Sequence, residues 1–234
     1  VTGILATNNN AISLGPVTLT GSTTADSNGG DIATGDVTGG GNALVLDGAA
    51  TGTITVNSFS GGGDLTVTNS SSTTFTGAVD AATVTLTDTT NTVAFQGDTT
   101  ITAGLVTASQ GYGVSFTGTT NSVAGDTTFA STGVVTLGDA DSDSIEFTGG
   151  LDTRSASGTT TGGAVSTVDA AMDLSDLTLA ADTTLTSGSG AITGGAATDG
   201  ANNSFTLTLQ DNTAASKGAV TFNGAVTLNA LLTF

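Results

Sequence analysis

Four acidic residues near the middle of the chain have the greatest potential for chemistry, because their carboxylates alternate with small residues. They are Asp139, Asp141, Asp143 and Glu146. Carboxylates in such a pattern can converge on a hard cation such as Ca²⁺, which prefers roughly six to eight oxygen ligands. The segment departs from the EF-hand loop, since Ser144 stands where that loop needs glycine and Gly150 stands where it needs glutamate. Two interpretations stay open, a simple calcium loop at a β-turn and a solvated acidic turn.

Two other polar segments carry weaker signals. Asp169, Asp173 and Asp176 form a second acidic group, but their spacing specifies no ligand set, and a solvated face is the expected interpretation. The Gly-Gly-Gly-Asp run at residues 61–64 resembles calcium-binding nonapeptide repeats, which need tandem copies, and the chain has a single copy. Neither segment predicts a further metal site.

The inventory of reactive side chains argues against catalysis. The sequence contains no His and no Cys, so the usual general base, thiolate nucleophile and imidazole ligand are all missing. A pair of carboxylates could still hydrolyse a glycan. Such sites normally hold the sugar with aromatic and cationic side chains, whereas this chain has no Trp, a single tyrosine (Tyr112) and only Arg154 and Lys217 as cations. We therefore expect that the protein is not an enzyme.

Charge and composition exclude further classes. The formal net charge of −18 repels nucleic-acid phosphates and anionic membrane surfaces, so neither is an expected partner. No apolar run approaches the roughly 20 residues of a membrane-spanning helix. Charged residues make up only 9% of the chain, and Gly contributes 35 of the 234 residues. A single Pro and abundant Thr and Val nevertheless favour order over disorder.

The elements that would position these residues are short β-strands. Apolar residues recur at every second position and are bounded by Gly, Asn, Asp and Ser, which is typical of half-buried strands. Clear examples lie at residues 17–20, 43–46, 53–56, 84–86 and 205–209. Strands of this length at intervals of about ten residues are compatible with a β-sandwich or a β-solenoid.

A Phe-x-Gly repeat favours the solenoid. Its copies are Phe75/Gly77, Phe95/Gly97, Phe116/Gly118, Phe147/Gly149 and Phe222/Gly224. The first three phenylalanines are 20 and 21 residues apart, which is the length of one coil of a parallel β-helix. In such a coil we expect each Phe to stack on the Phe of the next coil. We expect each Gly to turn a corner with a backbone conformation that other residues avoid.

The spacing of the repeat becomes irregular after Phe116, which indicates coils that lack the marker or carry insertions. The Gly/Ser/Thr-rich residues 153–165 predict a protruding loop. Residues 168–174 are the best candidate for a helical turn. No shift of composition marks a domain boundary, so residues 1–234 are expected to form one repetitive region, which belongs to a longer chain or a polymeric assembly.

Recurrent Thr-x-Thr units, such as Thr18/Thr20 and Thr83/Thr85, raise a minor alternative. Stacked on one flat face they would resemble the ice-binding surface of some β-solenoids. Thr also simply suits the solvent side of a strand, because its β propensity is high. An ordered Thr row on one face would favour ice binding.

The final segment (residues 222–234, FNGAVTLNALLTF), the internal Phe-x-Gly copies and the Thr/Gly/Asn-rich strands together resemble giant bacterial β-strand-repeat surface proteins, such as filamentous-haemagglutinin-like and autotransporter-passenger-like adhesins. The resemblance spans nearly the whole chain, but it is compositional. It implies a right-handed parallel β-helix, export to the cell surface or the extracellular space, and a role in adhesion, a sheath or a biofilm matrix. It supplies no catalytic residues.

These observations predict a non-catalytic structural or adhesive fibre protein with an all-β, parallel β-helix fold and coils of about 20 residues. Self-association into filaments or layers is expected, with surface glycans or other matrix polymers as further partners. No cofactor is expected apart from the Ca²⁺ considered above. The main alternative is a β-sandwich pilus or surface-layer subunit, in which residues 1–5 or 228–234 complete the next copy by strand donation.

Overall fold

The computed structural model describes residues 1–200, 203–210 and 218–233, and every regular element within them is a β-strand. Residue 234, the last of the predicted donor segment 228–234, lies outside the described residues. In the described part of the chain, no helix is long and apolar enough to cross a membrane. The prediction of an all-β fold is confirmed.

The strands are short and follow one another closely along the chain. In the first half they are β1 (Gly3–Ala6), β2 (Ile12–Leu14), β3 (Val17–Thr18), β4 (Thr23–Asp26), β5 (Ile32–Thr38), β6 (Leu44–Asp47), β7 (Thr53–Ser60), β8 (Leu65–Ser70), β9 (Ser72–Phe75), β10 (Val79–Thr89), β11 (Thr92–Phe95), β12 (Thr99–Thr107) and β13 (Gly113–Phe116). In the second half they are β14 (Thr120–Val123), β15 (Thr127–Thr128), β16 (Val134–Leu137), β17 (Ser144–Phe147), β18 (Leu151–Asp152), β19 (Gly158–Thr167), β20 (Met172–Asp173), β21 (Leu177–Thr186), β22 (Ile192–Gly194), β23 (Ala197–Thr198), β24 (Leu207–Gln210), β25 (Val220–Phe222), β26 (Val226–Thr227) and β27 (Leu232–Thr233).

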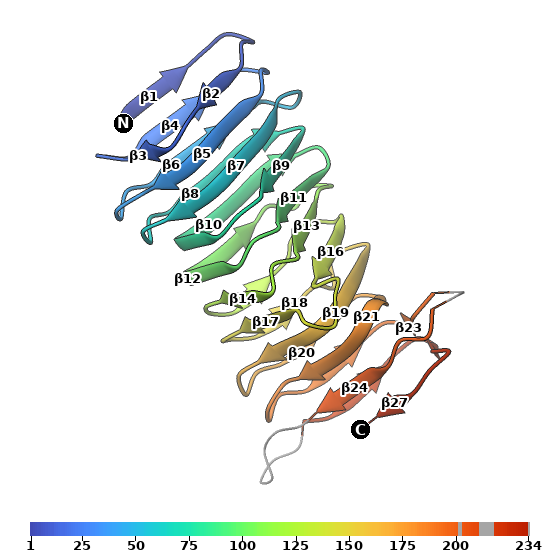
Figure 1. The fold of residues 1–234 in the computed structure, drawn as a ribbon. Helices are drawn as coiled ribbons and strands as arrows, with labels where there is room; N and C mark the ends of the chain where they lie inside the picture. Colours follow the sequence, from blue (N-terminus) through green and yellow to red (C-terminus); the bar gives the residue numbers. More distant parts are fainter. Residues whose placement is uncertain (201–202, 211–217, 234) are drawn as a thin grey trace.

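The chain winds into a β-solenoid of about 11 turns, with successive coils about 21 residues apart (Figure 1). Each coil adds one strand to each of three columns, and every strand pairing is parallel. The first column contains β1, β4, β6, β8, the second halves of β10 and β12, and then β15, β18, β20, β22 and β25. The second column contains β2, β9, β11, β13, β16, β23, β26 and the first halves of β5, β7, β19 and β21. The third column contains β3, β14, β17, β24, β27 and the remaining halves of the two-column strands.

This parallel stack shows that the β-sandwich alternative is wrong. The strand-donating pilus subunit loses its structural basis with it. The reason is visible in the register, because each inward apolar residue pairs with an inward residue one coil away, as Leu44 does with Leu65 and Ile32 with Ile54. Coils of nearly constant length therefore bury the same positions repeatedly, and the core runs along the axis of the rod.

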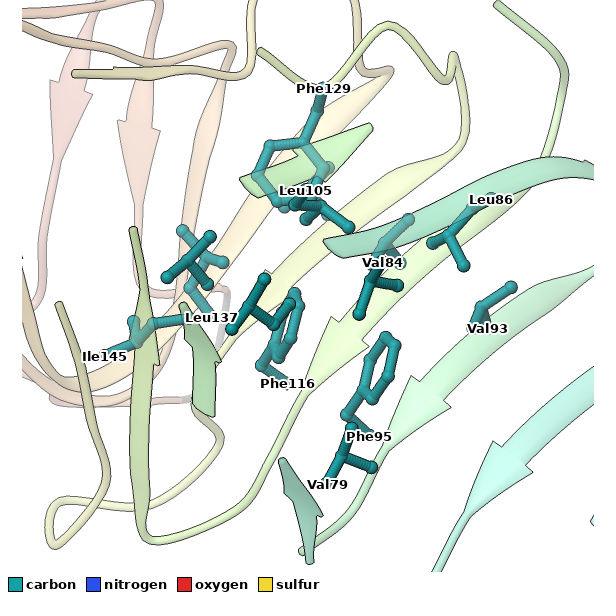
Figure 2. Packing of buried hydrophobic residues seen from close by; sticks show 14 of the residues in the cluster. Val79, Val84, Leu86, Val93, Phe95, Leu105, Phe116, Phe129, Leu137 and Ile145 are labelled. Atoms are coloured by element: carbon teal, nitrogen blue, oxygen red, sulfur yellow. The ribbon is translucent and has the colours of Figure 1, made fainter. Parts of the chain in front are cut away.

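The predicted stacking of phenylalanines is confirmed for three coils. The ring centroids of Phe75 and Phe95 are 5.0 Å apart and those of Phe95 and Phe116 are 4.8 Å apart, with interplanar angles of 4° and 7°. All three rings are fully buried and belong to the second column. Figure 2 shows Phe95 and Phe116 among the aliphatic side chains that fill the interior. The spacing between rings matches the roughly 4.8 Å between neighbouring strands.

The two later copies of the repeat do not belong to this stack. Phe147 is buried in the third column, where its backbone pairs with Val123 and Thr167 and its ring meets Phe129 edge-on. Phe222 is half-buried in the first column and pairs with Gly194. The expectation of a single aromatic register for all five copies is therefore wrong, because a strand end followed by a turn occurs in every column.

The glycines of the repeat serve a different purpose from the one expected. Positive φ angles occur elsewhere, whereas Gly77, Gly97 and Gly118 have ordinary backbone conformations. A Cβ atom on Gly118 would collide with the carbonyl group of Gly97, and one on Gly97 would collide with that of Gly77. Gly149 and Gly224 likewise face the backbone of the preceding coil. These glycines allow consecutive coils to approach closely where the chain leaves a strand.

Two irregular segments also differ from expectation. The predicted loop at residues 153–165 contains most of β19, and the predicted helical turn at residues 168–174 contains β20. Both strands are held by neighbouring coils, so pairing with a ready-made edge overrides the weak local preference. At β15 the first column is joined to β12 through Thr107, whose hydroxyl donates to the Thr128 carbonyl and accepts from the Ala130 amide.

Candidate functional site

The acidic segment predicted from sequence is the turn between β16 and β17. Asp143 is only 6% exposed, and its Oδ2 accepts hydrogen bonds from the backbone amides of Asp139 and Ala140 at 3.0 and 3.1 Å. The Asp143 amide in turn donates to the Ala140 carbonyl. The Asp143 carboxylate therefore closes its own turn and satisfies two amides that would otherwise lack partners.

Asp141 extends from the same turn across the surface of the rod. Its Oδ1 accepts a hydrogen bond of 2.8 Å from the amide of Asp182, which lies two coils further along the third column. The carboxylate of Asp182 accepts from the amide of Thr206 in the coil after that. Asp141 and Asp182 thus connect three coils within a span of four.

The acidic turn can pack closely against the next coil because that coil has glycines at the contact. A Cβ atom on Gly162 would lie 3.0 Å from the Ala140 nitrogen, and one on Gly163 would collide with the Asp143 carbonyl. Gly163 also has a left-handed φ of 76°, which side chains with a Cβ rarely adopt. The acidic turn of one coil and the Gly162–Gly163 step of the next are therefore complementary, and we call this arrangement the acidic clasp (residues 138–143, 162 and 163).

The two remaining predicted ligands differ in surroundings. Burial raises the pKa of Asp139, and a hydrogen bond with the Asp143 side chain and the negative charge of Asp143 raise it further. Glu146 points outward from β17, where its backbone pairs with Ser122 and Ser166. Among the described residues, no three Asp or Glu side chains gather closely enough to hold a metal ion. Calcium binding at this turn stays a prediction.

A recurrent structural role of aspartate was not predicted from the sequence. Seven Asp side chains each accept the amide of the residue at the equivalent position of the next coil, at 2.8–3.1 Å. In one pair, Asp169 with Ser189, the aspartate lies in the loop before β20. The other six pairs are Asp31 with Thr53, Asp64 with Thr83, Asp98 with Thr120, Asp126 with Gly150, Asp176 with Ala196, and Asp182 with Thr206. We call them the carboxylate clamps, and each adds one hydrogen bond to the end of a parallel ladder.

The signal for the clamps was available in the sequence. Five of the six aspartates other than Asp169 stand directly before the first inward residue of a strand, as Asp31 stands before Ile32, and Asp182 stands before the inward Thr183 inside β21. The clamps occur in all three columns, so they explain how so acidic a chain keeps its coils together. The amide and the hydroxyl of Thr53 both donate to Asp31 and hold the pKa of that carboxyl below its ordinary value.

The other predicted polar residues are not assembled into one site. Asp173 lies near Asp152, and Arg154 forms ion pairs with both, at 2.6 Å to Asp152 and 3.7 Å to Asp173. The hydroxyl of Tyr112 is buried, donates to the Leu86 carbonyl and accepts from the Ala108 amide. Burial raises the pKa of Tyr112 to about 12. These contacts tie coils together.

No protein-family model, curated protein or solved structure matches this chain. The function must therefore be argued from the geometry of the rod and its surface.

One continuous surface feature remains, a row of small outward side chains along the second column. It consists of Ser13, Ala33, Thr55, Thr74, Ala94, Ser115, Thr136, Thr160, Thr178, Thr198 and Thr227, each paired in register with the next. We call it the hydroxyl row. Ser or Thr occupies nine of its eleven positions. Seven Thr side chains are thus ordered on one face, but the Thr-x-Thr units singled out in the sequence do not form this row, since Thr18 lies in the third column and Thr83 and Thr85 lie in the first.

Proposed function

We propose that the chain is a non-catalytic structural or adhesive rod that works at the cell surface or in an extracellular matrix. The observation that carries the proposal is the second column, in which parallel pairing continues from β2 to β26 with one strand from every coil. A backbone ladder that runs along the axis resists bending and stretching, because every coil is hydrogen-bonded to its neighbours. Length and stiffness would then be the useful properties.

The composition and the side-chain contacts support a role without catalysis. The sequence supplies no His or Cys, and many carboxylates are engaged in the carboxylate clamps or the acidic clasp. The resemblance to bacterial β-strand-repeat adhesins agrees with export and with a place on the cell surface. Uncharged hydroxyl side chains on the outside suit neutral glycans or other matrix polymers as partners.

Mechanical unfolding tests the scaffold role. If single molecules are stretched between the two ends, we expect stepwise extension in units of about 65 Å, which is one coil of about 21 residues drawn out from the stack. Phe95→Ala should lower the force at which the central coils open, because Phe95 lies between two stacked rings. Extension at low force without steps would contradict the scaffold role.

A binding measurement tests the adhesive role separately. The immobilised chain should retain neutral polysaccharides and should not retain polyanions, since its net charge of −18 repels them. An unfolded sample of the same chain serves as the control for contacts that need no rod. Equal retention by folded and unfolded samples, or a preference for polyanions, would contradict adhesion by this surface.

Ice binding is a second candidate, and the hydroxyl row favours it. Its members repeat along a parallel sheet at about 4.8 Å, and a regular array of Thr hydroxyl and methyl groups could order water. Thermal hysteresis of the purified chain is the direct test. We expect Thr136→Asp and Thr160→Asp to abolish hysteresis if ice binds there, whereas absence of hysteresis in the unmodified chain would exclude this candidate.

A further inference from the structure

The second column differs from the other two in charge. Its strand residues include no Asp, Glu, Lys or Arg among the described residues, and we call its outward side the uncharged face. Outward acidic residues stand in the strands of the other two columns. They are Asp26, Asp47, Asp88, Asp152 and Asp173 in the first column and Asp36, Asp80, Glu146 and, where β21 enters that column, Asp182 in the third. Two copies with a net charge of −18 each would repel one another least through the uncharged face.

The uncharged face also has a protrusion next to a hollow. Val134 is 47% exposed, although it is a large apolar side chain in a strand. Its neighbours in register have no side chains, since it pairs with Gly158 on one side and its carbonyl faces Gly113 on the other. A hollow of about 440 Å³ adjoins it, lined among others by Thr92, Gly133 and Thr136. A protrusion beside a hollow on one face is self-complementary in a two-fold pair.

The size of the face suits a stable pair. About 11 turns at roughly 4.8 Å each give a length near 50 Å, and strands of about four residues give a width near 13 Å. The product is about 650 Å² for each copy, close to the roughly 800 Å² per partner of a standard specific interface. Small side chains let two such sheets approach to about 10 Å, the usual separation of packed sheets.

We propose that two copies of this chain pair side by side through their uncharged faces, with Val134 of each copy over the glycine-floored hollow of the other. The pairing deepens the proposed function and rests on it, because it names a second rod as the partner of the scaffold. The hydroxyl row lies at the centre of the contact, where its side chains can exchange hydrogen bonds across the interface. The acidic columns lie outside the contact and remain in solvent.

The test compares two exposed valines by sedimentation velocity over a wide range of protein concentration. Val134→Asp places a charge in the uncharged face, and we expect dimerisation to weaken by about tenfold or more, as for the loss of a central contact. Val106→Asp is the matched control, because Val106 is 53% exposed and points outward from the first column. We expect the control to dimerise like the unmodified chain. Circular dichroism of both variants checks that the strands persist.

Three outcomes would overturn the pairing. In the first, the unmodified chain is a monomer at every concentration. In the second, both substitutions weaken dimerisation equally. In the third, the chain is a monomer that shows thermal hysteresis, which would indicate that the uncharged face binds ice. The mechanical experiment above distinguishes the two proposals. A rod that unfolds coil by coil but does not dimerise refutes the pairing and leaves the scaffold role standing, whereas a chain that dimerises without mechanical resistance refutes the scaffold role.

Discussion

The coils with the stacked phenylalanines and the coils around the acidic clasp keep their alignment by different means. In the first region, Val93 pairs with Thr73 and with Val114, 20 and 21 residues away, and rings of equal size fall on top of one another. In the second region, 24 residues separate Val135 from its partner Thr159, and only 18 separate Thr159 from Leu177. A long coil is followed by a short one.

These two coils show how a solenoid tolerates an insertion. The extra residues of the long coil form the turn at residues 138–143, and that turn lies against Gly162 and Gly163 of the short coil. Both regions bury apolar residues, but the regular region adds a stack of aromatic rings, whereas the irregular region adds a turn that is held by the Asp143 carboxylate and accommodated by Gly162 and Gly163. Substitutions should therefore act differently in the two regions.

Removal of a central ring should have the largest effect. Phe95→Ala leaves a cavity between Phe75 and Phe116, and we expect a loss of about 3–5 kcal/mol in the free energy of unfolding. Phe222→Ala is the control, because Phe222 is half-buried and outside the stack. Urea unfolding followed by circular dichroism measures both. Equal losses would refute the special role of the stack.

A methyl group beneath the acidic turn should have the next largest effect. Gly163→Ala forces a left-handed backbone onto alanine and places its Cβ against the Asp143 carbonyl, for a loss of about 2 kcal/mol. Gly104→Ala is the matched control in β12, since a Cβ there would meet nothing within 4 Å. We expect the control to be neutral or slightly stabilising. If both changes cost the same, the clasp does not depend on space at Gly163.

Loss of the acceptor in the turn should cost less. Asp143→Ala leaves the amides of Asp139 and Ala140 without their carboxylate partner, and we expect a loss of about 1–2 kcal/mol. Asp143→Asn keeps an acceptor oxygen and removes the charge beside Asp139, so it should cost less than alanine. Faster amide hydrogen exchange at residues 139 and 140 in the alanine variant alone would locate the effect. A larger loss for asparagine would contradict this account.

The smallest effect is a pH dependence that has opposite signs at β5, which lies in the regular coils before the aromatic stack, and at the acidic clasp. Amide and hydroxyl donors from Thr53 lower the pKa of Asp31, and donors from Ser58 and Asn57 lower that of Asp36. Both residues therefore contribute stability above their unfolded pKa, and this contribution is lost as the pH falls through the folded pKa. Asp139 has a raised pKa, so its contribution is present below the unfolded pKa and is lost as the pH rises through the folded one.

Carboxyl ¹³C titration by NMR measures these signs directly. We expect Asp31 and Asp36 to titrate below the ordinary value of 3.8 and Asp139 to titrate above it. In the Asp143→Asn variant the pKa of Asp139 should move back towards the ordinary value, because the neighbouring charge is gone. An ordinary pKa for Asp139 would show that the turn is solvated and that the clasp is open.

The sequence predicted the regular region better than the irregular one, for a physical reason. Equal spacing and an aromatic marker identify Phe75, Phe95 and Phe116 as stacked, because one coil length repeats there. Phe147 carries the same local motif, yet it belongs to another column, and a local motif cannot report which column a strand joins. The long coil that begins at Val135 and the short coil after it compensate for each other in length. This compensation depends on how the coils stack and is not visible in a local sequence motif.

The candidate site shows the same limit. Alternation of carboxylates at Asp139, Asp141 and Asp143 was readable, but their amide partners include Asp182, which lies 41 residues further along the chain. The role of Asp98 and of the other clamp residues could be predicted only if the residue at the equivalent position of the next coil were known. Once the coil length is known, aspartate directly before an inward residue becomes a usable signal for such clamps.

Distances along the hydroxyl row test the stack of parallel coils most directly. The chain has no Cys, so spin labels can be attached at paired cysteine substitutions of Thr55 with Ser115, Thr160 or Thr198. These pairs are three, five and seven coils apart, and pulsed electron resonance should give backbone separations near 14, 24 and 34 Å at roughly 4.8 Å per coil. Separations that fail to grow by a constant step per coil would contradict the solenoid and every role derived from it.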